Sequence, residues 1–185
     1  MLPTDDRLVA AALDGDPAAY DALMNRHESL VYRVAYGFAA EREGALDIVQ
    51  STFLKALRSL ARFQGRCAFK TWLTRIALNE GLDWQKRHGR LRARHAPLDA
   101  AERAVAPDPG PEERALSAEA KRRLAGALAK LRRKYRVALT LRYLDGLSVP
   151  EVAEALSCSE ETARNVLYRG LKRLRTALSC AEEAR

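Results

Sequence analysis

The chain has 185 residues, a formal net charge of +8 and 48% hydrophobic residues. This length and composition suit one or two small globular domains and exclude a long disordered chain. The net charges of residues 1–95, 96–115 and 116–185 are +4, −3 and +7. The basic excess of the last segment favours a polyanionic partner, because each neutralised phosphate releases condensed counterions. Nucleic acid is therefore favoured over an anionic membrane.

Motifs that carry catalysis or bind cofactors are missing from the sequence. It contains no GxGxxG, GxxxxGK[ST], GxSxG or HExxH pattern, and Cys67, Cys158 and Cys180 are widely spaced without a zinc-type arrangement. We therefore expect no enzyme activity, metal, cofactor or disulfide framework. Neither a run of about 18 apolar residues nor a secretory signal occurs, which predicts a cytoplasmic protein without membrane insertion.

Helical periodicity predicts an all-α fold. Leu, Ala, Arg and Glu are abundant, apolar residues recur at helical spacing, and strand-like alternation is absent. Asp14-Gly15 ends the first helix, and Asp16 caps the second, which has Pro17 at its first position. The predicted N-terminal helices span residues 5–13, 17–38, from about 43 to just before Phe63, and 69–87.

An apolar stripe on the third helix predicts the face that packs in the core. The stripe comprises Ala45, Ile48, Val49, Phe53 and Leu57. Gln50 interrupts it, and because a polar side chain gains little from burial, we expect Gln50 at the surface.

A proline-rich segment divides the chain. Residues 96–115 hold four of the seven prolines, and the cluster from Pro107 to Pro111 cannot sustain a helix. The segment is predicted to be a stiff, extended, acidic linker between a helical domain of residues 1–95 and a second of residues 116–185. We expect the spacing of these domains to matter more than their mutual packing.

The last part of the chain has the pattern of a helix-turn-helix. After helices over 117–131 and 133–144, Asp145-Gly146 ends a helix and Ser148 to Glu151 forms a capping box. The box predicts a short helix to Leu156. A turn at Ser157-Cys158 follows, and Ser159 caps a longer basic helix from Glu160 to about Leu178.

The longer helix has one apolar and one basic face. Its inward stripe is predicted to be Ala163, Val166, Leu167, Leu171 and Leu174. The outward side chains are of types that read DNA, since arginine can fork onto guanine and asparagine can pair with adenine. The outward residues are Arg164, Asn165, Tyr168, Arg169 and Lys172. An ordinary solvated face is the alternative for them.

Two ordered blocks of sequence carry a family resemblance. The C-terminal block comprises residues 139–148 (LTLRYLDGLS), 151–153 (EVA), 162–165 (TARN) and 169–174 (RGLKRL). The N-terminal block comprises residues 47–56 (DIVQSTFLKA) and 63–79 (FQGRCAFKTWLTRIALN). Together these blocks resemble the extracytoplasmic-function (ECF) sigma factors of the bacterial sigma-70 family. The resemblance covers nearly the whole chain and implies a non-catalytic subunit that binds core RNA polymerase, recognises two elements of promoter DNA and helps to melt it.

The resemblance assigns roles to residues of the N-terminal block. Asp47, Gln50, Phe53 and Leu54 correspond to the core-polymerase docking face, with core packing as the alternative for Phe53. The minus-ten element is assigned to Phe63, Lys70, Trp72 and Asn79. An aromatic surface with an amide edge can receive an unstacked base, and a basic side chain can follow the phosphates. Trp72 is interpreted as core that shapes this pocket.

The C-terminal block is assigned to the minus-thirty-five element. The residues are Arg142, Arg164, Asn165, Tyr168, Arg169 and Lys172. Arg142 precedes the helix-turn-helix and is chosen by resemblance alone, whereas Lys172 is expected to contact phosphate rather than bases. The resemblance also allows an anti-sigma factor as a second protein partner, and the free protein is expected to be a monomer.

Two other functions compete with this interpretation. A freestanding helix-turn-helix regulator would use residues 1–95 to sense a ligand or to dimerise, but the chain has no heptad seam for a dimer. A nuclease would need clustered carboxylates to hold a metal, and the acidic residues here are dispersed among basic ones.

Overall fold

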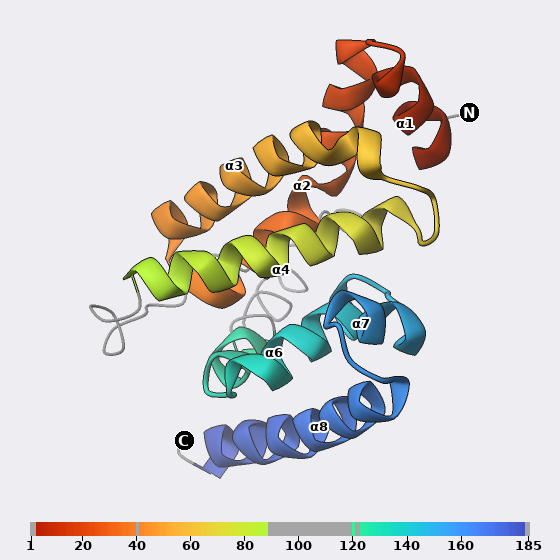
Figure 1. Ribbon diagram of the computed structural model, residues 1–185. Helices are drawn as coiled ribbons and strands as arrows, with labels where there is room; N and C mark the ends of the chain where they lie inside the picture. Colours follow the sequence, from red (N-terminus) through yellow and green to blue (C-terminus); the bar gives the residue numbers. More distant parts are fainter. Residues whose placement is uncertain (1–2, 40, 89–119, 121–122, 184–185) are drawn as a thin grey trace, which may run out of the picture.

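The computed structural model describes the chain except residues 1–2, 40, 89–119, 121–122 and 184–185. Within the described residues all regular structure is helical, which confirms the all-α prediction. The helices form an N-terminal group, α1 to α4, and a C-terminal group, α6 to α8 (Figure 1). The predicted linker, residues 96–115, lies outside the described residues.

The N-terminal helices begin and end close to the predicted positions. The Asp16 carboxylate accepts a hydrogen bond from the backbone N–H of Ala18 at 2.9 Å, so it caps the second helix as expected. A short 3₁₀ turn, η1, extends the third helix to Arg62. The elements are α1 (Asp5–Leu13), α2 (Pro17–Ala39), α3 (Arg42–Ser59), η1 (Leu60–Arg62) and α4 (Phe69–His88).

Close packing holds α2 against its neighbours. The Tyr20 hydroxyl donates to the backbone carbonyl of Phe53 at 2.5 Å, which ties α2 to α3. Burial raises the pKa of Tyr20 to about 12, so the phenol remains a donor. On the other side, a Cβ at Gly81 would lie 2.4 Å from the Phe38 ring, so glycine is what lets α4 approach α2 there.

The apolar stripe predicted on α3 is wrong at one end. Ala45, Ile48 and Val49 are buried, but Phe53 is half-buried and Leu57 is 51% exposed. Thr52 and Ala56 complete the buried stripe instead. Thr52 can be buried because its hydroxyl donates to the Ile48 carbonyl of its own helix at 2.6 Å, which satisfies its polar group.

The C-terminal helices differ from the predicted pattern at two points. The segment predicted as one helix over 133–144 changes to a π-helix at Thr140, where the Asp145 N–H donates to the Thr140 carbonyl at 3.1 Å. The last helix extends past Leu178 to Glu183. Residues 123–129 are also helical, and the further elements are α6 (Arg133–Leu139), η2 (Thr140–Leu144), α7 (Val149–Ala155) and α8 (Glu160–Glu183).

The helix-turn-helix forms through the predicted caps. Ser148 accepts from the backbone N–H of Glu151, whose carboxylate accepts in return from the Ser148 N–H at 2.8 Å, so the capping box is confirmed. Gly146 before it has a φ of 70°, the left-handed conformation that the turn requires. Ser159 caps α8 through the N–H of Thr162 at 3.2 Å.

The two helical groups pack against each other, a contact that the sequence did not predict. Helix α4 contacts α7, and α2 contacts α6 (Figure 1). One contiguous cluster of buried side chains includes Leu73 and Trp84 from the first group with Leu141 and Val152 from the second. Both groups therefore share a hydrophobic core.

The breadth of the buried arc on α4 explains why this packing was not predicted. Its buried positions spread over about half of the helix circumference at 3.6 residues per turn. They include Thr71 and Thr74, which are at most 1% exposed. Because threonine is counted as polar in a periodicity analysis, the second packing face of α4 is not visible in the sequence.

Polar contacts also cross the interface. The Arg33 guanidinium of α2 donates through Nε to Asp145 Oδ1 at 2.7 Å, and Arg136 of α6 donates to the Gly37 carbonyl at 2.6 Å. The Arg133 guanidinium lies over the Phe38 ring, 5.3 Å from its centroid. Ion pairing and hydrogen bonding thus add specific geometry to the shared apolar core.

Candidate nucleic-acid and partner interfaces

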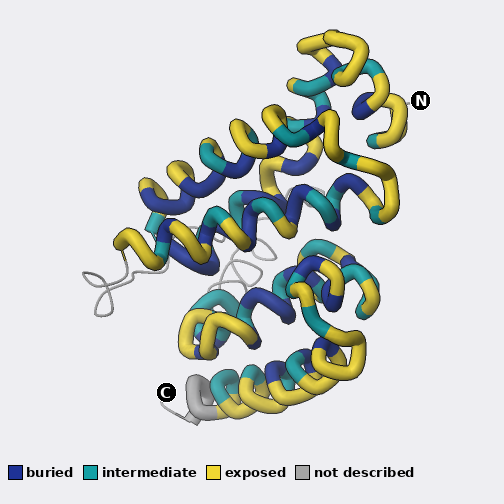
Figure 2. The backbone as a smooth tube through the Cα atoms, in the orientation of Figure 1, coloured by how far each residue is buried: buried dark blue, intermediate teal, exposed yellow. Residues whose placement is uncertain are grey.

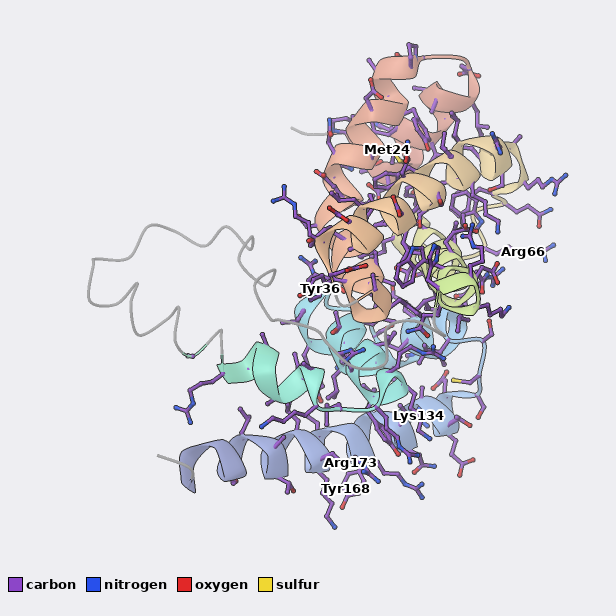
Figure 3. All side chains as sticks on the ribbon, turned by 90° about the vertical axis from the view of Figure 1, so that its left-hand side faces the viewer. Met24, Tyr36, Arg66, Lys134, Tyr168 and Arg173 are labelled. Carbon is purple, nitrogen blue, oxygen red and sulfur yellow. The ribbon has the colours of Figure 1, made fainter. Side chains whose placement is uncertain are left out.

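The outward face of α8 is exposed as predicted. Arg164, Asn165, Tyr168, Arg169 and Lys172 are all exposed, and Tyr168 is 70% exposed. Figure 2 shows this exposed face along α8 on the side away from the rest of the molecule, and Figure 3 shows Tyr168 there. A long surface helix with basic and amide side chains suits the major groove of DNA.

The inward face fixes the orientation of α8. Ala163 and Leu167 are buried, and Leu167 belongs to a cluster with Leu131, Tyr135 and Leu139. At Gly170 an added Cβ would lie 3.2 Å from the Leu139 side chain, so α6 and α8 approach closely there. The outward residues are therefore presented by a packed helix pair.

Arg142 and Arg164 both have partners within the chain. Arg142 is half-buried, and its guanidinium donates to the Leu147 carbonyl at 2.8 Å, which braces the turn before α7. Arg164 pairs with Glu160 one turn earlier at 2.6 Å, and both side chains are largely exposed. Such a surface pair contributes at most about 1 kcal/mol, so it does not prevent Arg164 from contacting DNA.

The outer side of α3 is an apolar surface with polar edges. Gln50, Asp47 and Leu54 are exposed as expected, and Leu54 is 48% exposed. Leu46 and Leu57 are exposed beside them and were missed in the sequence. The spacing of positions 46, 50 and 54, four residues apart on one side of a helix, is the signal that could have identified Leu46. Exposed leucines grouped in this way are typical of a protein-binding surface.

Aromatic side chains gather where η1 leads into α4. The Phe63 ring lies 5.2 Å from Trp72 and 5.7 Å from Phe69, measured between ring centroids. Phe63 and Trp72 are half-buried, whereas Phe69 is buried. Asn79 is exposed on α4, two turns beyond Trp72 on the same side of the helix. Phe63 and Trp72 thus form one surface, with Asn79 about 10 Å further along.

Lys70 faces the C-terminal domain. Its ammonium lies 3.5 Å from the Glu151 carboxylate of α7, and the Thr71 hydroxyl donates to the same carboxylate at 3.3 Å. Partial burial opposes ionisation of Glu151, but hydrogen bonds from Ser148 and the charge of Lys70 hold its pKa below the ordinary value. One carboxylate therefore caps α7 and engages the first turn of α4.

The described residues were searched for a reactive cysteine, a metal-binding group and a membrane-spanning helix. Burial and a hydrogen bond with Glu154 raise the pKa of the Cys67 thiol, so it is not activated as a nucleophile. No group of three or more His, Cys, Asp or Glu side chains in the described part of the chain could hold a metal ion. None of the helices described here is long and apolar enough to span a membrane.

Two family models match the chain in the same order as its two helical groups. The model of Sigma-70 region 2 matches residues 23–91, and the model of Sigma-70, region 4 matches residues 121–174.

Proteins related to the chain match it over most of their length. The ECF RNA polymerase sigma factor SigE of Mycolicibacterium smegmatis is 35% identical over 182 residues, which cover 96% of this chain and 70% of that protein. The ECF RNA polymerase sigma-E factor of Escherichia coli strain K12 is 34% identical over 173 residues, which cover 90% of each.

Solved structures share the fold. CnrH, in complex with the cytosolic domain of CnrY, has a TM-score of 0.70 at 26% identity, covering 95% of this chain and 97% of that one. The sigma factor RpoE, in complex with the anti-sigma factor NepR from Bartonella quintana, has a TM-score of 0.66 at 20% identity, covering 86% of this chain and 96% of that one.

Proposed function

The chain belongs to the extracytoplasmic-function branch of the sigma-70 family of RNA polymerase sigma factors, and from that premise we propose which of its surfaces carry the function. Core RNA polymerase binds the outer side of α3. The aromatic surface at the start of α4 recognises the minus-ten element, and α8 recognises the minus-thirty-five element. Residues 1–95 and 116–185 form the two functional domains, joined by residues 96–115.

The α3 surface is the observation that carries the proposal. Asp47, Gln50 and Leu54 lie exposed on one side of the helix, beside Leu46 and Leu57. An apolar patch with a polar edge fits a helical partner. Leucines that become buried on binding supply affinity, while the polar groups fix the orientation of the partner. Phe53 is half-buried and supports the surface from its flank.

The minus-ten element is assigned to Phe63, Trp72 and Asn79. A base extruded from the duplex can stack on the Phe63 and Trp72 surface, while the Asn79 amide supplies hydrogen bonds further along α4. Lys70 contacts the DNA backbone only after its ion pair with Glu151 separates.

The minus-thirty-five element is assigned to α8. Arg164, Asn165, Tyr168 and Arg169 contact base edges, and Lys172 contacts phosphate. Arg142 has two roles in this assignment. It holds the turn before α7 in place through its hydrogen bond to the Leu147 carbonyl, and it contacts the phosphate backbone of the DNA.

The family sets the protein's remaining properties. Sigma factors are DNA-binding subunits without catalytic activity, and we place this one in the cytoplasm as a monomer that exchanges into polymerase. The solved complex of RpoE with the anti-sigma factor NepR supports an anti-sigma factor as a second partner.

Co-elution with bacterial core RNA polymerase on size exclusion tests the proposal. The wild-type chain co-elutes, and the Gln50→Ala/Leu54→Ala variant does not. The exposed positions predict normal folding of this variant, which circular dichroism checks. A matched control, Leu13→Ala/Asn25→Ala, removes a leucine of the same exposed fraction and an exposed amide outside α3, and still co-elutes.

Two outcomes would contradict this assignment. Co-elution of the α3 variant at wild-type levels would exclude α3 as the docking surface. No co-elution of the wild-type chain, together with tight binding to duplex DNA alone, would favour a freestanding helix-turn-helix regulator.

A further inference from the structure

A basic groove runs between the start of α6 and the length of α8. Two adjoining hollows of about 400 and 240 Å³ share Tyr135 and Arg169 as lining residues. The first hollow is also lined by Lys172, Arg173 and Thr176, and the second by Lys134, Thr162, Asn165 and Val166. The linings therefore contain four cationic side chains and no acidic one.

The cations of the groove are held near one another without neutralisation. The Lys134 ammonium lies 5.0 Å and the Arg173 guanidinium 5.2 Å from the centroid of the Tyr135 ring. The pKa of Tyr135 is below its ordinary value: desolvation raises it, but the charges of Lys134, Arg173 and Arg169 lower it by more. Within the described part of the chain, none of the four groove cations forms an ion pair. Such a site attracts an anion.

The groove adjoins the face of α8 assigned to the minus-thirty-five element. Asn165 and Arg169 line the groove and also lie on that face. A helix about 10 to 12 Å wide fills a major groove about 12 Å wide, so its flanks face the phosphate backbones that form the walls. Figure 3 shows Lys134 on α6 and Arg173 on α8 at the same end of the molecule.

We propose that this groove binds phosphates of the DNA backbone beside the minus-thirty-five element, with Lys134 and Arg173 as contacts that carry no sequence information. The proposal rests on the function proposed for α8 and adds residues outside the set assigned to base recognition. Tyr135 positions both cations through its ring, and the Thr176 hydroxyl lies within the same lining as a further polar group.

The salt dependence of DNA binding tests the groove. The full chain is titrated against a fluorescein-labelled 30-base-pair duplex of random sequence between 50 and 200 mM salt. The Lys134→Gln/Arg173→Gln variant is expected to reduce the slope of log affinity against log salt by about two, one for each lost phosphate contact. Preference for a selected upstream sequence over random sequence is expected to stay at the wild-type ratio, because phosphate contacts do not read bases.

A charge-matched control isolates the position of the cations. Arg7→Gln/Arg42→Gln removes the same net charge from exposed residues of α1 and α3, outside the groove lining and away from α8, and its slope is expected to equal that of the wild type. Melting temperatures of both variants check that loss of the Arg173 contact with Tyr135 has not unfolded α8.

The possible results separate the groove from the proposed function. If the Lys134→Gln/Arg173→Gln variant keeps the wild-type slope of log affinity against log salt, the proposal that the groove binds DNA phosphates is overturned. No duplex binding by the wild-type chain at 50 mM salt overturns direct DNA recognition by α8 and the groove with it. A groove-dependent rise in melting temperature with inorganic phosphate, combined with an unchanged DNA slope, would assign the site to a free anion and overturn the backbone contact.

Discussion

Asp145 is an ionisable residue whose buried position disfavours the charged form of its carboxyl group. Its side chain has no exposed surface, and Oδ1 accepts the hydrogen bonds from Arg33, whereas Oδ2 is buried without a hydrogen-bond partner in the described residues. Burial raises the pKa of Asp145, and the Arg33 charge opposes that rise without cancelling it. The folded protein therefore binds the Asp145 proton more tightly than the unfolded chain.

This pKa gives a sign to the pH dependence of stability. The tighter binding of the Asp145 proton in the folded state adds to the free energy of unfolding. This contribution is complete below the ordinary aspartate pKa and is lost as the pH rises through the raised pKa of the folded state. The free energy of unfolding of the wild type, minus that of Asp145→Asn, is therefore expected to be larger at pH 4 than at pH 7. Urea unfolding at both pH values measures it, and a constant or reversed difference would contradict the raised pKa.

Arg164 tests base recognition separately from charge. Arg164→Lys keeps the positive charge but loses the planar fork that pairs with guanine. Binding to an upstream sequence selected from a random duplex pool is expected to weaken by about 1 to 3 kcal/mol, with the salt slope unchanged. An equal loss on all sequences in a competition assay would make Arg164 a phosphate contact instead.

Single residues show where sequence analysis succeeds and fails. The outward residues of α8 were predictable because one apolar stripe fixes the opposite face of a helix. The partner of Lys70 was not predictable, because Glu151 lies 81 positions further along the chain and meets it only through tertiary packing. Burial of Thr52 and Thr74 depends on hydrogen bonds to their own helices, which hydrophobic periodicity does not detect.

At the scale of elements, α7 depends on its cap. A seven-residue helix has few internal hydrogen bonds, so the reciprocal bonds of Ser148 and Glu151 satisfy a large share of its unpaired N–H groups. The signal for this cap is local, which is why the start of α7 could be predicted from four residues. The π-turn of η2 has no such local signal, so the change of helix type at Thr140 was not predicted, although the helix ends at Leu144 as expected.

Removal of the cap is expected to cost about 1 kcal/mol. Ser148→Ala loses the acceptor for the Glu151 N–H and weakens the start of α7. Ser179→Ala is the matched control, because Ser179 donates only to the Arg175 carbonyl within exposed helix and its loss is expected to be near zero. Thermal unfolding compares the two, and equal effects would show that the cap does not stabilise α7.

At the scale of the whole molecule, Arg33 and Asp145 connect residues from the two domains. Arg33→Ala leaves the Asp145 carboxylate buried and unpaired, and is expected to cost about 3 kcal/mol of unfolding free energy. Arg33→Ala/Asp145→Asn is expected to recover part of this loss, because the unpaired charge is removed.

A surface ion pair provides the comparison. Arg26→Ala breaks the pair with Asp5 inside one domain, where both side chains are partly exposed, and is expected to cost about 1 kcal/mol or less. All three variants are compared by urea unfolding. If the double variant is no more stable than Arg33→Ala, the charge of Asp145 does not carry the cost.

The packed arrangement of the domains limits how far the protein can reach. A compact chain of 185 residues has a radius of gyration of about 16 Å. Promoter elements centred about 25 base pairs apart are separated by about 85 Å of duplex at 3.4 Å per base pair. Fully extended, a stretch of 31 residues such as 89–119 spans at most about 110 Å, little more than this separation. On the proposed function, simultaneous contact with both elements therefore requires the shared core to separate, and the free energy for that opening comes from partners that bind the open form more tightly than the closed one.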